Sequence, residues 1–243
     1  MFKIEVKTAL LHPMQVLSHP RWIGAYLSKG RAGLLRQMVD DSIRELRQSP
    51  SPSSIEEVVA SQLHSSLGKI GAIQEYLYRL VRFTQPEKIV ETGVYRGVSS
   101  SYVLAALEDN GKGRLFSIDL PQAKYRDPVS GRLDNSPLIP GEEVGFAIPS
   151  RLRSRWQLRL GDAREELPRL LADLGTIQLF IHDSEHTYQH MTWEFELAYQ
   201  HLPAGGFLVS DDVNWNDSFH DFVSKHDPSW SMVVKNRLGI ARV

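Results

Sequence analysis

Lys88-Ile-Val-Glu-Thr-Gly-Val-Tyr-Arg-Gly-Val-Ser-Ser-Ser101 is the stretch of sequence that decides the fold of this chain. Its apolar start predicts a buried strand over 88–92, and the run over 99–110 predicts a helix. Gly93 and Gly97 lie between the two, where they permit a tight turn and a close approach of the backbone. Strand, glycine turn and helix together direct backbone N–H groups and a helix N-terminus toward a ligand. The stretch therefore predicts a ligand-binding turn in an α/β protein.

The acid at the end of this strand, Glu91, indicates what kind of ligand the turn binds. A carboxylate there would repel a phosphate but would attract an ammonium group or a ribose hydroxyl. The glycines also have the spacing G-x-x-x-G and not the G-x-G-x-x-G of pyrophosphate binders. We therefore expect a nucleoside-like ligand that carries a positive charge and no phosphate.

Residues 91–99, Glu-Thr-Gly-Val-Tyr-Arg-Gly-Val-Ser, resemble the first motif of class I S-adenosylmethionine (SAM)-dependent methyltransferases. The resemblance is closest to the catechol and caffeoyl-CoA O-methyltransferases and their sugar-methylating relatives. It implies a cofactor, SAM, whose methionine end is held by residues of this turn: Glu91, Gly93, Tyr95, Gly97 and Ser99.

Strands and helices alternate from Lys88 onward, which predicts a parallel sheet with helices on both faces. The expected strands are 88–92, 114–119, 156–160, 177–182 and 206–211, followed by a hairpin of 231–235 and 239–243. This pattern resembles the Rossmann-like methyltransferase sheet of seven strands, whose seventh strand is antiparallel. The expected domain covers 86–243, after an N-terminal helical extension over 1–85.

Two regions outside these strands carry open alternatives. The extension 1–85, with expected helices at 37–48, 55–70 and around 70–81, either only packs on the sheet or also forms a substrate lid or homodimer contact. Residues 121–150 are rich in proline and glycine, and loops this long are functional or disordered. This loop either covers the active site or is an inert surface excursion.

Two further strand ends carry candidate cofactor contacts. Asp119 ends the strand 114–119, where nucleoside-binding α/β proteins bind ribose hydroxyls, although such an acid can also cap a turn. The resemblance places the pair Asp162-Ala163 against the adenine ring. Asp162 also has capping-box spacing with Glu165, so a helix cap is the alternative.

Three aspartates follow two neighbouring expected strands: Asp183, Asp211 and Asp212. Adjacent parallel strands would bring these carboxylates close together, where they would repel each other unless a cation joined them. Carboxylate oxygens suit Mg²⁺ or another divalent cation. We therefore expect a magnesium site here, with Asp183 also near the cofactor.

The same pairing resembles the metal-dependent O-methyltransferase branch, although Asp212 stands where that branch has asparagine. The resemblance implies that Trp215 and Asn216 line the substrate site. It also places His186 where the branch has its catalytic base, and histidine can accept a proton near pH 7. As an alternative, His186 is only a first-turn residue of the expected helix 187–202.

The expected function is SAM-dependent, Mg²⁺-assisted O-methylation of a small-molecule hydroxyl on a sugar, phenol or other natural product. The alternative is a non-catalytic SAM-binding or partner-binding protein with a drifted metal site, and the missing G-x-G-x-x-G disfavours an NAD-dependent oxidoreductase. The 28 basic and 29 acidic residues nearly cancel, so no nucleic-acid partner is expected. With no cysteine, no signal peptide and no long apolar run, a cytoplasmic protein away from the membrane is expected.

Overall fold

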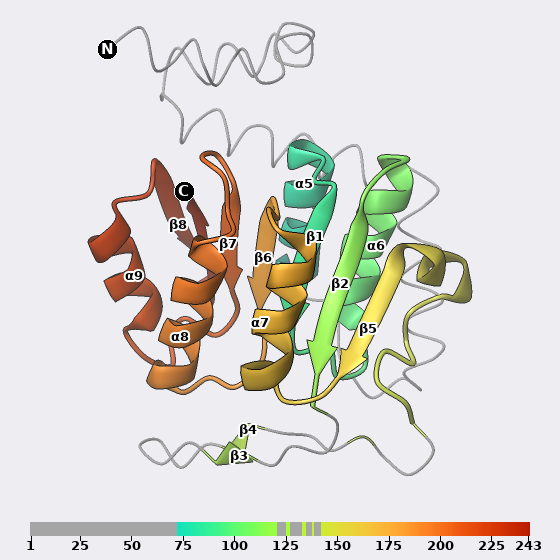
Figure 1. Cartoon of the computed structure of the whole chain (residues 1–243), viewed down its shortest axis with the longest axis horizontal. Helices are drawn as coiled ribbons and strands as arrows, with labels where there is room; N and C mark the ends of the chain where they lie inside the picture. Colours follow the sequence, from blue (N-terminus) through green and yellow to red (C-terminus); the bar gives the residue numbers. More distant parts are fainter. Residues whose placement is uncertain (1–71, 121–124, 127–132, 135–137, 139–141) are drawn as a thin grey trace, which may run out of the picture. The chain divides into compact units, whose positions relative to one another are not determined.

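The computed structural model describes residues 72–120, 125–126, 133–134, 138 and 142–243 (Figure 1). The helices expected at 37–48 and 55–70, and most of the loop 121–150, lie outside these residues. Within the described part, no helix is both long and apolar enough to cross a membrane. The domain division at residue 86 stays a prediction.

A seven-stranded sheet forms the centre of the described residues, in the spatial order β5-β2-β1-β6-β7-β9-β8. β9 is antiparallel to both of its neighbours, while the first five strands pair in parallel. The bounds are β1 (Lys88–Thr92), β2 (Arg114–Asp119), β5 (Trp156–Leu160), β6 (Leu179–His182), β7 (Phe207–Ser210), β8 (Trp230–Val234) and β9 (Leu238–Arg242). The seven-stranded, mostly parallel sheet expected from the sequence is confirmed. A separate pair, β3 (Tyr125–Arg126) and β4 (Leu133–Asp134), is antiparallel.

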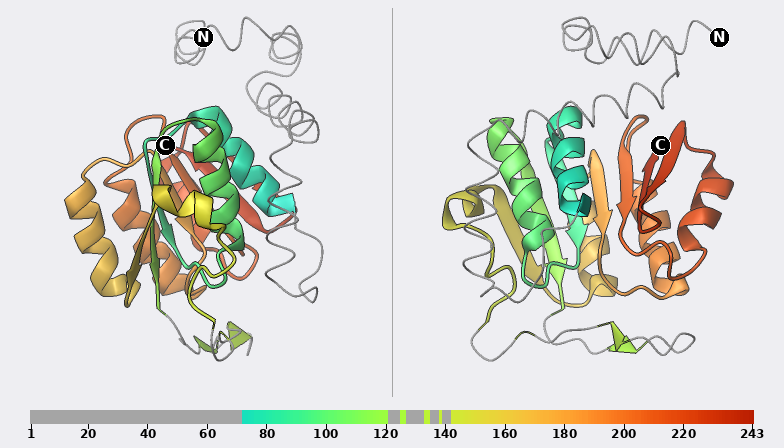
Figure 2. Two further views of the ribbon diagram at one scale, coloured as in Figure 1. Left: turned by 90° about the vertical axis from the view of Figure 1, so that its right-hand side faces the viewer. Right: turned by 180° about the vertical axis from the view of Figure 1, so that it is seen from behind.

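Helices cover both faces of the sheet, as Figure 2 shows in its edge-on view. α5 and α6 lie on one face, and α7, α8 and α9 on the other. The bounds are α5 (Ala72–Thr84), α6 (Val98–Asp109), η1 (Ser150–Arg155), α7 (Ala163–Leu174), α8 (Tyr188–Tyr199) and α9 (Ser218–His226). α5 packs on α6, and two hydrogen bonds join them: the Tyr78 hydroxyl donates to Asp109 Oδ2 at 2.5 Å, and Arg82 donates to Asn110, the C-cap of α6, at 2.6 Å.

Two helices have ends that differ from those expected from the sequence. α8 was expected over 187–202, but Thr187 is its N-cap and accepts from the His190 N–H at 3.1 Å. The helix ends at Tyr199 and is followed by i→i−3 bonds, from the His201 N–H to Ala198 and from the Leu202 N–H to Tyr199, since Pro203 has no N–H to continue the helical ladder. α6 ends at Asp109, with Asn110 as the C-cap.

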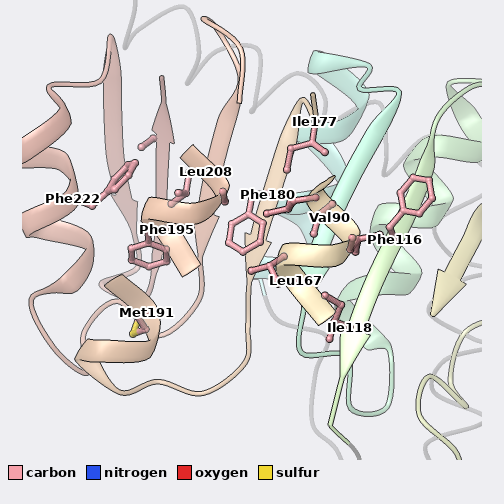
Figure 3. Packing of buried hydrophobic residues seen from close by; sticks show 14 of the residues in the cluster. Val90, Phe116, Ile118, Leu167, Ile177, Phe180, Met191, Phe195, Leu208 and Phe222 are labelled. Carbon is pink, nitrogen blue, oxygen red and sulfur yellow. The ribbon is translucent and has the colours of Figure 1, made fainter. Parts of the chain in front are cut away.

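One hydrophobic core lies between the sheet and the helices α7, α8 and α9 (Figure 3). Every second strand residue contributes to it, since successive side chains point to opposite faces. Because both faces of the sheet are covered, the central strands β6 and β7 are buried at every position. The core includes Val90, Phe116, Phe180, Leu208 and, from the helices, Leu167, Met191, Phe195 and Phe222.

The sheet brings the carboxyl ends of its parallel strands to one edge. Thr92 is in register with His182, and His182 with Ser210, so the residues that follow these positions are neighbours. β9 runs the other way, so the turn that precedes it lies beside the end of β7. This edge therefore collects the β1–α6 turn, the two aspartate segments and the β8–β9 turn.

Candidate functional site

Glu91 is a buried carboxylate at the end of β1, with 1% of its surface exposed. Its Oε2 accepts from the hydroxyls of Ser100 at 2.8 Å and Ser117 at 2.7 Å. Its other oxygen, Oε1, is buried and has no hydrogen-bond partner in the described part of the chain. Burial raises the pKa of Glu91 to about 7, although the two hydroxyls lower it. A buried, unsatisfied carboxylate oxygen is costly, so it indicates a missing donor.

The turn after Glu91 has room for backbone only. Gly93 has φ +83°, and a Cβ there would lie 1.8 Å from the Asp183 carbonyl oxygen. Gly97 has φ +82°, and its Cβ would lie 2.6 Å from Ile148 Cγ1. Tyr95 adopts φ 52°, a conformation uncommon outside glycine that often marks functional sites. The glycines expected from the sequence are thus required by close approach on both sides of the turn.

Asp119, at the end of β2, holds this turn in shape. Its Oδ2 accepts from the backbone N–H groups of Val94 and Tyr95, both at 2.8 Å. The turn-capping role that the sequence left open for this residue is therefore present. Its expected ribose contact stays a prediction.

The end of the long loop packs onto the same turn. The Gly145 N–H donates to the Tyr95 carbonyl at 2.8 Å, and the Ala147 N–H donates to the Arg96 carbonyl at 3.0 Å. Arg96 also pairs with Glu142 at 3.3 Å. Residues 142–149 therefore pack against this turn, and the expectation that the loop 121–150 covers the active site stays a prediction.

Asp162 acts as a helix cap in this structure. Its side chain accepts from the Arg164 N–H at 2.8 Å, and Ala163 is the first residue of α7. The Gly161 N–H donates to the Asp119 carbonyl at 2.9 Å, which brings this segment beside the end of β2. Contact with an adenine ring stays a prediction for both residues.

The three aspartates do gather at the ends of β6 and β7. The Asp183 N–H donates to the Thr92 carbonyl at 2.8 Å, and the Asp211 N–H donates to the His182 carbonyl at 2.9 Å. Burial, followed by the charges of Asp211 and Asp212, raises the pKa of Asp183 well above its usual range. The crowding of acids inferred from the sequence is therefore real.

A residue that the sequence analysis missed, Arg237, neutralises two of these acids. Its Nε and Nη2 lie 2.9 Å and 2.6 Å from the two carboxylate oxygens of Asp211. Its Nε also lies 2.9 Å from Asp212 Oδ1. The hydrogen bond to Asp211, together with the acidic charges nearby, raises the pKa of Arg237, so the guanidinium stays charged.

These contacts do not fit the expected magnesium site. A divalent cation binds through carboxylate oxygens, and the positively charged Arg237 already contacts both oxygens of Asp211 and one of Asp212. No group of three or more His, Cys, Asp or Glu side chains is placed to hold a metal ion within the residues the structure describes. Asp211 and Asp212 are thus held in a salt bridge with Arg237, and a magnesium site formed by Asp183, Asp211 and Asp212 is not shown.

His186 lies between the aspartates and the predicted substrate residues. Its Nε2 is 4.0 Å from Asp212 Oδ2, and its ring centroid is 5.2 Å from that of Trp215. Asn216 donates to the His186 carbonyl at 3.1 Å, which fixes this loop to the start of α9. The structure therefore brings together the base and the substrate residues expected from the sequence.

A second buried network supports the loop that carries Asp183 and His186. Glu194 of α8 is fully buried, and its carboxylate accepts from Thr92 at 2.6 Å and Ser184 at 2.9 Å. It also contacts His182 at 2.6 Å and His190 at 2.8 Å. Burial alone would raise the pKa of Glu194, but the two histidines hold it well below its usual range. An ionised carboxylate therefore ties β1, β6 and α8 together.

The comparisons with known proteins agree with this architecture. A sequence model described as a methyltransferase domain matches residues 90–213, which is just over half of the chain. None of the curated protein sequences is significantly similar. The matched range begins in β1 and ends just after the aspartate pair, so it includes every site residue expected from the sequence except Trp215 and Asn216, and it excludes Arg237.

Three solved structures show the likeness in fold. An O-methyltransferase from Bacillus cereus in complex with SAH is 13% identical, has a TM-score of 0.51, and covers 80% of this chain and 91% of its own. The SAH-bound methyltransferase PaMTH1 from Podospora anserina is 13% identical with a TM-score of 0.52, covering 85% and 95%. CalS11, a calicheamicin methyltransferase, is 20% identical with a TM-score of 0.52, covering 85% and 91%. With the motif over 88–101, the sheet order and the matched domain in agreement, the chain belongs to the methyltransferase domain family and has the fold of class I SAM-dependent methyltransferases.

Proposed function

We propose that this chain transfers a methyl group from SAM to a hydroxyl group of a small molecule. The observation that carries the proposal is Glu91, whose buried Oε1 has no hydrogen-bond donor among the residues that the structure describes and lies beside a turn that admits only backbone. The ammonium group of the methionine moiety would supply that donor and a positive charge. A phosphate would be repelled there, which argues against a nucleotide.

Each part of the binding turn has its own role in this proposal. Glu91 binds the ammonium group, and the backbone of Gly93 to Gly97 approaches the methionine moiety. Asp119 faces the ribose, and Asp162 with Ala163 lies near the adenine. When bound, SAM supplies a methyl group on a positively charged sulfur, which a hydroxyl oxygen can attack.

The acceptor side of the site is formed by His186 and its neighbours. We assign His186 the role of general base that takes the proton of the acceptor hydroxyl. Trp215 lies against it, and an aromatic side chain suits the apolar face of a sugar or phenol. Asp212, 4.0 Å from the histidine, stabilises the positive charge that His186 gains.

One structural neighbour supports the choice of oxygen as the acceptor atom, and a second supports a small-molecule acceptor. The Bacillus cereus protein is an O-methyltransferase solved with SAH, the demethylated product of SAM, and CalS11 is a methyltransferase of calicheamicin. Magnesium assistance, which the sequence predicted, is not part of this proposal, because Arg237 bonds to the carboxylates that would hold the ion.

The proposal is tested by titration calorimetry of SAM, SAH and NAD into the full chain. We expect SAM and SAH to bind, NAD not to bind, and Glu91→Gln to weaken SAM by about 100-fold, since a charged hydrogen bond in a buried site is lost. Glu165→Gln, at an acid with 71% side-chain exposure on α7, is the matched control and should bind like the wild type. Binding of NAD in preference to SAM, or a Glu91→Gln variant with wild-type affinity, would refute the proposal.

Turnover is then measured with SAM against a panel of hydroxyl compounds that includes sugars and phenols. Methyl transfer to oxygen on any of them would support the activity. SAM binding with no transfer across the panel would favour a non-catalytic SAM-binding protein.

A further inference from the structure

The turn between β8 and β9 presents Arg237 to the acid cluster. Lys235 and Asn236 both have positive φ, 52° and 54°, which is the geometry of a tight two-residue hairpin turn. The Arg237 N–H donates to the Val234 carbonyl at 3.0 Å, and the Arg237 carbonyl accepts from the Val213 N–H at 2.9 Å. The backbone of Arg237 is thus anchored to the hairpin on one side and to the aspartate segment on the other.

The guanidinium lies where the carboxylates converge. It forms a two-point contact with Asp211 at 2.9 Å and 2.6 Å, and its Nε is 2.9 Å from Asp212 as well. Asp211 has 10% side-chain exposure and Asp212 has 18%, so the pairing is shielded from water, although Arg237 itself is half exposed. A planar guanidinium that meets a carboxylate at two points is the strongest geometry available to this pair.

Arginine and a divalent cation compete for this position. Each N–H takes one of the two lone pairs of the carboxylate oxygen that it contacts, which leaves fewer lone pairs for an ion. A guanidinium never loses its charge in a protein, so an incoming ion would also be repelled. For Mg²⁺ to enter, the ion would have to displace Arg237 from Asp211 and leave the arginine with no equivalent partner in this cluster.

We propose that Arg237 is the permanent cation of this site, so that the protein binds SAM and transfers methyl groups without a divalent metal. The acid cluster still binds a positive charge beside the cofactor site, but the Arg237 side chain supplies that charge in place of a metal ion. The part of this inference that concerns turnover rests on the proposed function, whereas the part that concerns metal binding does not.

This assignment has a consequence for the acceptor. A metal ion can bind two neighbouring oxygens of the acceptor by chelation, whereas a guanidinium has no vacant coordination position and only donates hydrogen bonds. The acceptor hydroxyl is then bound through His186 and Asp212 alone. Compounds with a single hydroxyl should therefore be methylated as readily as those with two adjacent hydroxyls.

The test is titration calorimetry of MgCl₂, and separately of MnCl₂, into EDTA-treated full chain. The wild type is expected to show no metal isotherm, and its SAM affinity should be the same with EDTA and with Mg²⁺. Arg237→Met, which keeps the aliphatic length but removes the charge, should bind the ions at least ~100-fold more tightly than the wild type. Adding Asp183→Asn to that variant should abolish the gain. A stoichiometric metal isotherm in the wild type, or no gain in Arg237→Met, would overturn the proposal.

Two controls keep the result interpretable. Arg237→Lys retains a positive charge and should not gain metal binding. If Arg237→Met does not fold, Arg237→Gln, which also removes the charge, is titrated in its place. Arg159→Met removes an arginine that pairs with Asp173 on the protein surface at 2.7 Å, and it should leave both titrations unchanged. SAM titrated into the same samples separates the two proposals. If the wild type does not bind SAM, the proposed function is contradicted, but the metal titrations still test whether Arg237 excludes the ion.

Discussion

Replacing Glu91 by glutamine should change how the stability of the protein depends on pH. The folded protein raises the pKa of this carboxyl from 4.5 to about 7, so folding favours the protonated form. The stability that this group contributes is complete below pH 4.5 and is lost as the pH rises through 7. Glutamine cannot ionise, so the variant should not show this loss.

The size of the effect follows from the two pKa values. Between pH 5 and pH 8, the wild type should lose roughly 2–3 kcal/mol of unfolding free energy through Glu91 that the variant keeps. Any constant cost of burying the amide beside Ser100 and Ser117 affects both pH values equally. It therefore cancels when the difference between variant and wild type at pH 5 is subtracted from that at pH 8.

The assay is urea unfolding of wild type and Glu91→Gln at both pH values, without SAM, followed by circular dichroism and tryptophan fluorescence. Trp156 reports on the same site, because its indole N–H donates to Ser117 Oγ at 3.0 Å. Glu165→Gln, at an exposed acid, is the control and should run parallel to the wild type. If the difference between Glu91→Gln and wild type stays within about 1 kcal/mol from pH 5 to pH 8, Glu91 is not a buried acid with a raised pKa.

Three further substitutions test other parts of the site. Gly93→Ala would place a Cβ 1.8 Å from the Asp183 carbonyl oxygen and should abolish SAM binding. Gly111→Ala has open space around its Cβ, so it should cost only the ~1–2 kcal/mol of its backbone strain. Equal effects of the two variants on SAM binding and stability would contradict the packing argument at Gly93. Glu194→Ala leaves two histidines without their shared carboxylate and should cost ~3–5 kcal/mol in urea unfolding, and a cost below 1 kcal/mol would exclude a structural role. His186→Ala should keep SAM affinity in calorimetry but lower turnover by ~10²-fold or more, and unchanged turnover with an accepted substrate would remove it from the mechanism.

The strand bounds of the central sheet could be predicted from sequence because the signal is local. β1, β2 and β5 begin and end at the expected residues, since each is a short apolar or alternating run that stops at a loop-forming or acidic position. The helix ends were less certain, because α8 stops three residues early, where i→i−3 bonds replace the helical ones ahead of Pro203.

In the candidate site too, residues with a local sequence signal were predicted, and residues that act through distant contacts were missed. Glu91, Gly93 and the three aspartates were identified because each lies at the end of a buried strand, and strand ends of a parallel sheet meet at one edge. Ser100 and Ser117 were missed because a buried hydroxyl that bonds to a distant carboxylate has no sequence signature. Glu194 was missed for a similar reason, since α8 carries it into contact with a strand 102 residues away at Thr92.

The sequence by itself determined the order of the elements, the glycine turn and the gathering of acids, because all three follow from local pattern and the pairing rules of parallel strands. Only the tertiary structure decided what neutralises those acids. Arg237 lies 26 residues after Asp211, in a hairpin turn where an arginine would be read as a solvent-exposed side chain. β9 returns antiparallel beside β7 and brings that turn to the acid cluster. A guanidinium therefore lies beside the carboxylates for which a metal ion was expected.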